Sequence, residues 1–246
     1  MGSVVAVLSG KGGTGKTSVC AGVSIALAQS GLRVLCVDCD VGLRNLDISL
    51  GLSDSGALSF QDVSEGGYSL SQAAVHPSYP SLRFLTAPMN RGVGQVNAQA
   101  FFEMLHQARS QFDYILLDAA AGVDAGFQLV SRAADRCIVV TGSGPAAVRD
   151  ASRVGELLEL AGKSDVRLIV NRVDRTMLSI LHQTIDDVMD AAGLPLLGVV
   201  LDDPDVPMAA ACGMSLERYN KHASAVRSFA RIAKRIQGFP EPIKIR

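Results

Sequence analysis

Short apolar runs alternate along the chain with longer stretches in which apolar residues recur every three or four positions. The short runs predict strands at residues 4–8, 34–38, 82–86, 114–118, 136–140, 167–171 and 196–200. The run at 115–117 is continuously apolar, which is typical of a parallel strand covered on both faces. The longer stretches predict helices at residues 15–30, 98–110, 146–160, 176–192 and 223–237. Residues 53–79 are richer in Ser and Gly, so we expect short helices and loops there.

Strand-then-helix repetition favours an α/β protein built on a doubly wound, mainly parallel sheet. The sequence contains neither an internal repeat nor a linker, so we expect one domain over residues 1–246, in which 218–246 form a basic C-terminal helix and tail. Apolar residues make up 48% of the chain and charged residues 19%, which excludes an intrinsically disordered protein.

Three further features of the composition point to a cytoplasmic protein. The first ten residues lack the basic start of a signal peptide. No run approaches the roughly 18 consecutive apolar residues of a membrane-spanning helix. The five cysteines are therefore expected to be reduced thiols rather than a disulfide framework.

Charge is unevenly distributed. The net charge of −1 does not indicate a nucleic-acid-binding protein. Residues 214–246 contain eight basic and two acidic residues, a balance of +6, and the remainder contains 15 basic and 22 acidic residues, a balance of −7. The acidic body argues against a DNA-binding face, so DNA is not expected as a partner.

The strongest motif is the glycine-rich stretch at residues 10–17, which follows the first predicted strand and opens the first predicted helix. It matches G-x-x-x-x-G-K-[ST], in which backbone N–H groups and a helix N-terminus converge on phosphate oxygens. Lys16 is expected to reach the β- and γ-phosphates and Thr17 to ligate Mg²⁺. The predicted phosphate-binding residues are Gly12, Gly13, Thr14, Gly15, Lys16, Thr17 and Ser18.

A second lysine, Lys11, stands at the start of this loop. Spacing alone leaves two interpretations open. Lys11 is either a solvated loop lysine or a cation supplied to transition-state charge, as an arginine finger is.

Residues 11–17, Lys-Gly-Gly-Thr-Gly-Lys-Thr, resemble the deviant Walker A motif of the MinD/ParA family of dimeric ATPases. Residues 38–47, Asp-Cys-Asp-Val-Gly-Leu-Arg-Asn-Leu-Asp, resemble switch I of its MinD branch, and 148–150 and 170–172 are also MinD-like. The resemblance covers residues 4–213. It implies a SIMIBI-type P-loop NTPase that forms an ATP-dependent homodimer and hydrolyses ATP slowly when a partner stimulates it. In such a dimer Lys11 reaches across the interface to the other subunit's phosphates.

Three aspartates stand where predicted strands end, at the edge of the sheet where α/β proteins bind ligands. Carboxylates beside a triphosphate suit Mg²⁺ coordination and orientation of an attacking water. Asp118 has the pattern of a Walker B aspartate that holds Mg²⁺. The resemblance assigns Asp40 to the attacking water and Asp38 to the outer shell of the metal. The predicted catalytic residues are Lys11, Lys16 and Asp40, and the predicted metal-binding residues are Thr17, Asp38 and Asp118.

The stretch after Asp118 departs from the family pattern. MinD proteins usually carry Ser-Pro where this chain has Ala119 and Ala120. The alanines remove a hydroxyl and a fixed φ, so the coupling of switch II to a partner stays open. Nucleotide binding is expected to survive this change.

The base of the nucleotide is assigned by the resemblance. It implies that Asn171 reads the adenine edge beside Arg172, and that Asp202, Asp203 and Pro204 form the loop on the other side of the base. Spacing alone does not separate ATP from GTP, and the absence of a GTPase-type N-K-x-D motif favours adenine. The expected ligands are ATP and Mg²⁺.

The resemblance implies a spatial switch that places the cell-division septum, with a protein activator or effector of the Min type. Three alternatives stay open: a MinD relative that sets flagellar number, a ParA-type DNA partition ATPase, and a nucleotide-dependent scaffold that does not hydrolyse ATP.

The helix at 223–237 is either docked on the sheet with a solvated basic side or an interfacial helix drawn to an anionic membrane. MinD proteins usually continue from their last packed helix into a membrane anchor, but residues 238–242 break the helix here. The anchor is absent, was removed from this sequence, or is replaced by residues 223–239. If the helix or an anchor binds anionic lipid, the protein lies peripherally on the inner face of the cell membrane.

Overall fold

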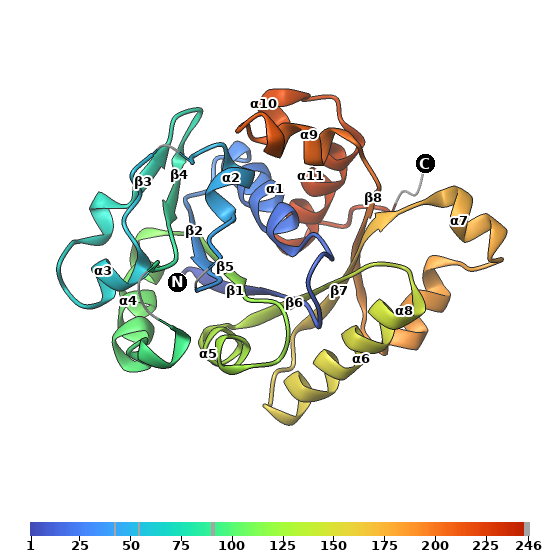
Figure 1. Cartoon of the computed structure of the whole chain (residues 1–246), viewed down its shortest axis with the longest axis horizontal. Helices are drawn as coiled ribbons and strands as arrows, with labels where there is room; N and C mark the ends of the chain where they lie inside the picture. The colour runs from blue at the N-terminus through green and yellow to red at the C-terminus, as the bar shows by residue number, and fades with distance from the viewer. Residues whose placement is uncertain (42, 54, 90–91, 244–246) are drawn as a thin grey trace.

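The computed structural model describes residues 1–41, 43–53, 55–89 and 92–243. Within these residues one eight-stranded sheet carries helices on both of its faces (Figure 1). The strands are β1 (Ser3–Leu8), β2 (Val34–Cys39), β3 (Ala74–His76), β4 (Tyr79–Leu85), β5 (Tyr114–Ala119), β6 (Arg136–Thr141), β7 (Val166–Val173) and β8 (Leu196–Leu201). The helices are α1 (Lys16–Gln29), α2 (Leu46–Leu50), α3 (Phe60–Ser64), α4 (Ala98–Gln111), α5 (Ala125–Ala133), α6 (Pro145–Leu160), α7 (Arg175–Ile180), α8 (Ile185–Ala192), α9 (Asp205–Ala211), α10 (Leu216–Tyr219) and α11 (Ser224–Ile236). Short 3₁₀ turns lie at Leu70–Gln72 and Val93–Gln95.

The strands run in the order β3-β4-β2-β5-β1-β6-β7-β8. Every neighbouring pair is parallel except the edge pair β3 and β4, which is antiparallel. The predicted doubly wound, mainly parallel α/β fold is therefore confirmed. Because the carboxyl ends of the parallel strands share one edge, the loops that leave β1, β2, β5 and β7 meet there.

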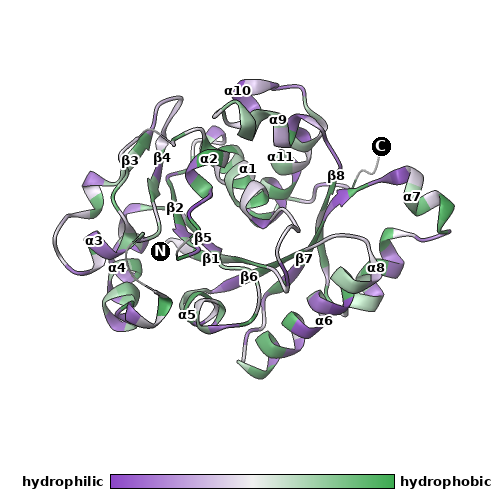
Figure 2. Cartoon of the chain, in the orientation of Figure 1, coloured by the Kyte–Doolittle hydropathy of each residue, from purple (hydrophilic) through white to green (hydrophobic). Residues whose placement is uncertain are grey.

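The core has two layers because successive strand residues point to opposite faces. On β1, Val5 and Val7 pack with α1 and α11, whereas Val4, Ala6 and Leu8 pack with α4, α5 and α6. Figure 2 shows the central strands as mostly hydrophobic and the outer helices as two-sided in colour. This two-faced burial explains the continuous apolar runs of the sequence.

One predicted helix is wrong in its extent. Residues 176–192 form two helices, α7 and α8, rather than one. His182, between them, has a φ of +50°. The hydroxyl of Thr184 then accepts a hydrogen bond from the N–H of Asp187 at 3.1 Å and starts α8 as a capping box. The apolar periodicity continues through residues 176–192, but the capping box at Thr184 starts a new helix within it.

The C-terminal helix α11 is docked on the body of the molecule. Its side chains Phe229, Ile232, Ala233 and Ile236 are buried against α1 and the sheet. This agrees with the first of the two interpretations of that helix. Lys244 and Arg246 of the basic tail lie outside the described residues. Among the described residues, no helix combines the length and apolar character needed to cross a membrane.

Candidate functional site

The glycine-rich loop connects β1 to α1 as predicted. Gly13 and Gly15 have φ values of +79° and +80°, which favour glycine. At Gly15 the backbone angle is one reason against a side chain and lack of space is another, because a Cβ atom there would lie 2.2 Å from the Nδ2 atom of Asn171. Helix α1 begins at Lys16, so its N-terminus directly follows the loop.

The loop has the character of a phosphate cradle. A Cβ atom at Gly12 or Gly13 would meet nothing within 4 Å, so the space above the loop is open. The hydroxyl of Thr14 is buried, yet it has no hydrogen-bond partner among the described residues. A buried hydroxyl without a partner is costly unless a ligand or water pairs with it. These features fit bound phosphate groups.

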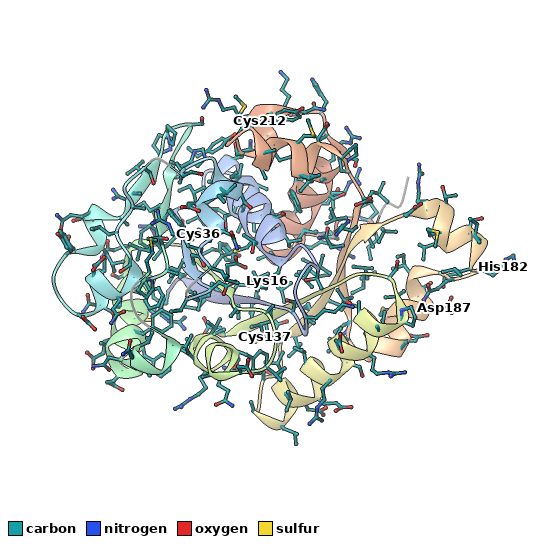
Figure 3. All side chains as sticks on the ribbon, in the orientation of Figure 1. Lys16, Cys36, Cys137, His182, Asp187 and Cys212 are labelled. Atoms are coloured by element: carbon teal, nitrogen blue, oxygen red, sulfur yellow. The ribbon has the colours of Figure 1, made fainter. Side chains whose placement is uncertain are left out.

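Lys16 and Asp118 form a buried ion pair. The Nζ atom of Lys16 lies 2.7 Å from Oδ1 of Asp118, and the two side chains are 6% and 1% exposed. Burial alone lowers the pKa of Lys16, but the charge and hydrogen bond of Asp118 raise the pKa by more, so its net shift is upward. Figure 3 shows Lys16 near the middle of the molecule. The predicted phosphate lysine and metal aspartate thus contact each other.

Asp38 stands beside Asp118 in the sheet, because the two residues are in register across β2 and β5. Its carboxylate accepts backbone N–H groups from Asp40 at 2.9 Å, Asn45 at 3.2 Å and Leu46 at 3.1 Å. Burial, together with the charge of Asp118, raises the pKa of Asp38 to about 7 despite these hydrogen bonds. In this structure Asp38 organises the switch I loop, and its role in the outer shell of a metal stays a prediction.

Asp40 and Lys11 face the same edge of the sheet with little to restrain them. Asp40 is half-buried, and burial raises its pKa although Lys16 opposes the shift. The side chain of Lys11 is exposed and has no described hydrogen-bond or ion-pair partner. Both are therefore free to contact a ligand or a second chain. Gly42, within the same motif, lies outside the described residues.

Two contacts of the loop were not predicted from the sequence. The N–H of Gly122 donates to the carbonyl of Ser9 at 3.0 Å, which ties switch II to the end of β1. A Cβ atom at Gly10 would lie 2.7 Å from Cβ of Asp150, so this glycine lets α6 pack under the loop. The Val-Arg-Asp motif at 148–150 carried this signal, but only as a family resemblance.

A cavity of about 400 Å³ opens between the glycine-rich loop and the β8–α9 loop. The predicted base-binding residues meet at its wall together with two glycines of the loop and Ser18 of α1: Gly13, Gly15, Ser18, Asn171, Arg172, Asp202, Asp203 and Pro204. The amide of Asn171 donates to the carbonyl of Thr14 at 2.8 Å. Arg172 contacts the carbonyl of Gly13 and the carboxylate of Asp202, each at 3.4 Å. The structure brings this set together, and its role in base binding stays a prediction.

Asp203, in the wall of this cavity, also makes hydrogen bonds to the start of α11 and to its own loop. Its carboxylate accepts from the Ser224 hydroxyl at 2.7 Å and from the Ala225 and Asp205 N–H groups at 3.0 and 3.1 Å. Burial raises the pKa of Asp203, but these hydrogen bonds lower it by more, so the net shift is downward. The carboxylate therefore joins the base loop to the start of α11.

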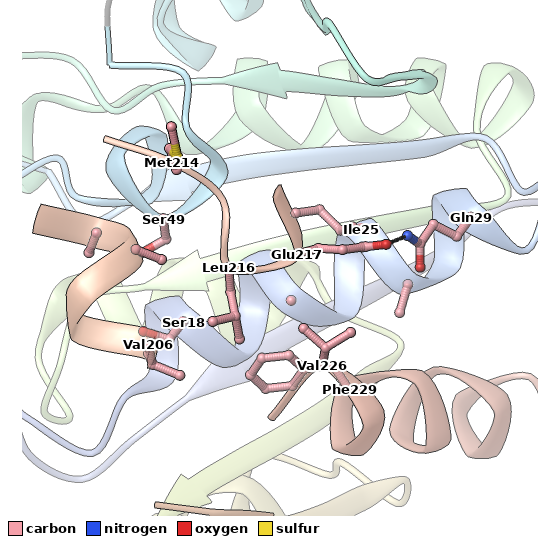
Figure 4. A pocket seen from close by; sticks show the side chains of 14 residues that line it. Ser18, Ile25, Gln29, Ser49, Val206, Met214, Leu216, Glu217, Val226 and Phe229 are labelled. Carbon is pink, nitrogen blue, oxygen red and sulfur yellow. Dashed lines mark hydrogen bonds between the residues drawn. The ribbon is translucent and has the colours of Figure 1, made fainter. Parts of the chain in front are cut away.

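A smaller apolar cavity of about 40 Å³ lies behind the base cavity, between α1 and the C-terminal helices (Figure 4). Ser18, Val206 and Phe229 line both cavities. Gly22 permits the close approach of Phe229, since a Cβ atom there would lie 2.1 Å from Cδ2 of the ring. Gln29 donates a hydrogen bond to Glu217 at the far end of the cavity (Figure 4). The cavity thus lies between α9, the helix that follows the base loop, and the helices α1 and α11.

Comparison with known proteins agrees with this geometry. A model of the CobQ/CobB/MinD/ParA nucleotide binding domain matches residues 5–216. The septum site-determining protein MinD of Synechocystis sp. is 35% identical over 240 residues, which make up 97% of this chain and 90% of that protein.

Two solved structures are also similar. A chain of the MinC:MinD cell division protein complex of Aquifex aeolicus has a TM-score of 0.90 and 30% identity, covering 98% of each chain. The septum site-determining protein MinD of Pyrococcus horikoshii OT3, complexed with Mg-ADP, has a TM-score of 0.84 and 27% identity, covering 96% of each chain. The resemblance seen in the motifs extends to nearly the whole fold.

Proposed function

Because the chain belongs to the CobQ/CobB/MinD/ParA family of nucleotide-binding domains, we propose that it is an ATP hydrolase whose nucleotide state controls placement of the cell-division septum. The observation that carries the proposal is the open phosphate cradle, in which the buried Thr14 hydroxyl has no hydrogen-bond partner within the described part of the chain and the N-terminus of α1 lies beside the loop. Residues 1–246 act as a single ATPase domain in this proposal.

The phosphate groups are held by the backbone of Gly12 to Gly15, by Lys16 and by the residues that begin α1, Thr17 and Ser18. Thr17 and Asp118 would hold Mg²⁺, with Asp38 beside them in the outer shell. When bound, Mg²⁺ neutralises charge on the phosphate oxygens. As nucleotide enters, Lys16 gives up its ion pair with Asp118 and pairs with phosphate instead.

Hydrolysis depends on two residues that are accessible at the edge of the sheet. Asp40 orients the attacking water. Lys11 is exposed, and it supplies positive charge to the phosphates of a second copy when two chains close over their nucleotides. The homodimer is therefore part of the catalytic unit. Asn171 and Arg172 contact the adenine from one side, and the loop at 202–204 covers it from the other.

The switch acts through partners. The Aquifex aeolicus relative was solved in complex with MinC, and we propose a protein effector or activator of the Min type for this chain. The ATP-bound dimer sits in the cytoplasm or peripherally on the inner face of the cell membrane. Anionic lipid would be attracted by the exposed basic side chains of α11, such as Arg227 and Lys234.

Phosphate release from ATP tests the enzymatic proposal. We expect slow Mg²⁺-dependent release that the Asp40→Ala variant lacks while it still binds ATP. The absence of any Asp40-dependent release would instead favour a nucleotide-dependent scaffold that does not hydrolyse ATP, the alternative to which Ala119 and Ala120 in switch II point.

Sedimentation tests the surface on which the switch acts. The protein is mixed with anionic liposomes or duplex DNA, in Mg·ATP or Mg·ADP. We expect pelleting with liposomes in Mg·ATP alone and none with DNA. Pelleting with DNA would favour the partition type of ATPase, and no pelleting with lipid would contradict the membrane part of the proposal.

A further inference from the structure

A cavity of about 680 Å³ lies toward the amino ends of the strands, at the opposite edge of the sheet from the glycine-rich loop. We name it the basal pocket. Its floor belongs to the face of the sheet that α11 covers, because Val5, Ile138 and Leu197 are part of that layer of the core. Helix α11 ends at Ile236, and residues 238–242 then form the outer wall. The pocket is thus the part of this face that lies beyond the end of the helix.

Three arginines line the described part of this pocket. Arg136 is the first residue of β6, Arg167 is the second residue of β7, and Arg235 lies in the last turn of α11. The side chains of Arg136 and Arg167 are 42% and 50% exposed, so a ligand can reach them. Positive charges gathered in one cavity repel one another unless negative charge lies among them. The cluster therefore favours an anionic group in the pocket.

Two carboxylates stand in the same described wall and compensate only part of this charge. Asp165 pairs with both strand arginines, since its Oδ2 lies 3.1 Å from Nε of Arg136 and its Oδ1 lies 3.1 Å from Nε of Arg167. Glu241 pairs instead with Lys234, at 3.5 Å. Apart from that second pair, three guanidinium groups of the described wall stand against one carboxylate, a balance of +2.

The guanidinium groups also keep N–H donors that the fold does not use. Nη1 of Arg136 donates to the carbonyl of Ile236 at 2.8 Å, and Nη1 of Arg235 donates to the carbonyl of Leu197 at 2.7 Å. Neither Nη atom of Arg167 has a hydrogen-bond partner within the described part of the chain, and the same holds for Nη2 of the other two arginines. A guanidinium carries five N–H donors in all. The wall therefore offers charged donors to an incoming anion.

A phosphate ester matches this wall better than a carboxylate does. A carboxylate has two oxygens in one plane, and Asp165 already uses both of them on Arg136 and Arg167. The oxygens of a phosphate are arranged around a tetrahedron, so they can pair with the remaining donors of more than one guanidinium. The esterified part would then lie over the apolar floor, beside the ring of Phe239, a residue of the wall that is 58% exposed.

We propose that the basal pocket binds the phosphate group of a phosphate ester, held chiefly by Arg136 and Arg167. The ester is either a lipid headgroup or a small soluble molecule. In the lipid case, which rests on the proposed membrane position, the ring of Phe239 lies at the membrane interface, where aromatic rings are favoured. The amino edge of the sheet then faces the lipid, and the glycine-rich loop faces away from it, because the loop leaves the carboxyl end of β1.

Binding is tested by NMR on the protein in excess Mg·ADP, so that the glycine-rich loop does not take up the probe. The probe is glycerol phosphate, and glycerol is its uncharged control. We expect saturable shifts of the Nε–H signals of Arg136 and Arg167 and of the Phe239 amide with glycerol phosphate, and none with glycerol. Equal shifts with glycerol, or no saturable shift at these three positions, would overturn the proposal.

Two charge changes in the wall should act in opposite directions. Arg167→Gln removes one guanidinium and should raise the dissociation constant for glycerol phosphate about threefold to fivefold, the weight of one partly exposed ion pair. Asp165→Asn removes the competing carboxylate and should lower the same constant. Arg33→Gln is the matched control, because Arg33 is a half-exposed arginine paired with Asp113 at 2.8 Å, also near the amino ends of the strands but outside the pocket. Binding that neither wall variant changes would contradict the proposed site.

Vesicle sedimentation distinguishes the two sources of the phosphate. The protein and its Arg167→Gln variant are mixed with vesicles of phosphatidylcholine, with or without phosphatidylglycerol. A headgroup source predicts pelleting that requires phosphatidylglycerol, that Arg167→Gln reduces and that Arg33→Gln leaves unchanged. Glycerol phosphate binding without an effect of Arg167→Gln on pelleting identifies a small soluble ester instead.

Melting temperature separates a binding role of Arg167 from a folding role. Its ion pair is partly exposed, so we expect Arg167→Gln to lower the melting temperature no more than Arg33→Gln does. A larger fall with unchanged probe binding would assign Arg167 to the fold and overturn the proposal. The NMR reporters lie in the pocket itself, whereas failure of the nucleotide proposal would appear as probe-induced shifts of the Gly12 and Gly13 amides in the loop. The two failures are therefore distinguishable.

Discussion

The ammonium of Lys16 lies 2.7 Å from the carboxylate of Asp118, and both side chains are buried. In the proposed function each group has another partner, since Lys16 binds phosphate and Asp118 holds Mg²⁺. The pair therefore keeps two buried charges compensated until nucleotide arrives. Nucleotide binding exchanges one set of electrostatic partners for another.

Lys16→Ala removes one member of this buried pair and leaves the Asp118 charge uncompensated. We expect the free energy of unfolding without nucleotide to fall by about 3–5 kcal/mol, measured by urea denaturation. The dissociation constant for ATP, measured by titration calorimetry, should rise more than about tenfold. An unchanged dissociation constant would contradict the assignment of the phosphate loop.

Lys11→Ala is expected to act on assembly rather than on folding, because its side chain is exposed and has no described partner. Melting temperature and monomer ATP affinity should stay close to those of the unaltered chain. ATP-dependent dimers, followed by analytical ultracentrifugation in Mg·ATP and Mg·ADP, should disappear. Loss of affinity together with the dimer would argue against a role in trans.

Gly22→Ala tests the packing of α11 on α1. Alanine adds about 1 kcal/mol of helix propensity, but its Cβ atom would lie 2.1 Å from the Phe229 ring. Overpacking costs about 1–3 kcal/mol, so we expect a net loss in the free energy of unfolding. Adding Phe229→Leu should recover part of that loss. Strictly additive effects of the two substitutions would mean that the ring does not cause the strain.

Asp203→Asn tests the carboxylate that joins the base loop to α11. The folded pKa of Asp203 is lowered from its ordinary value of 3.8, so its ionised form stabilises the fold above that value. This contribution is lost as pH falls through the lowered pKa. Urea denaturation should therefore show the variant less stable at pH 7, with the difference closing below about pH 4. A difference that is the same at both pH values would contradict the assignment.

Strands were predictable from the sequence because both faces of the sheet are buried. The run at 114–118 is apolar until Asp118, and the strand ends one residue later at Ala119. Helices that depend on a local exception were missed. Helix α9 carries Pro207 in its first turn, where the missing N–H breaks no helical hydrogen bond. In the sequence, however, a proline at this position is more typical of a loop than of a helix. Helix α5 is only nine residues long and follows a run of alanines.

The glycine-rich loop between β1 and α1 was predictable because its signal is the spacing of residues within one short stretch. The pairing of Lys16 with Asp118, 102 positions away, depends instead on the order of the strands. The same is true of Asp203 and Ser224, which are 21 positions apart and meet only when α11 docks. Sequence motifs identified these groups without indicating which of them compensate one another in the folded chain.

The glycine-rich loop is fastened on one flank. The side-chain amide of Asn171 donates to the carbonyl of Thr14 and the guanidinium of Arg172 donates to that of Gly13, so two hydrogen bonds tie the loop to the end of β7. On the opposite flank the side chains of the exposed Lys11 and the half-buried Asp40 have no hydrogen-bond or ion-pair partner among the described residues. In the proposed function we therefore expect a one-sided switch, in which nucleotide changes the positions of side chains on the flank of Lys11 and Asp40 rather than on the flank tied to β7.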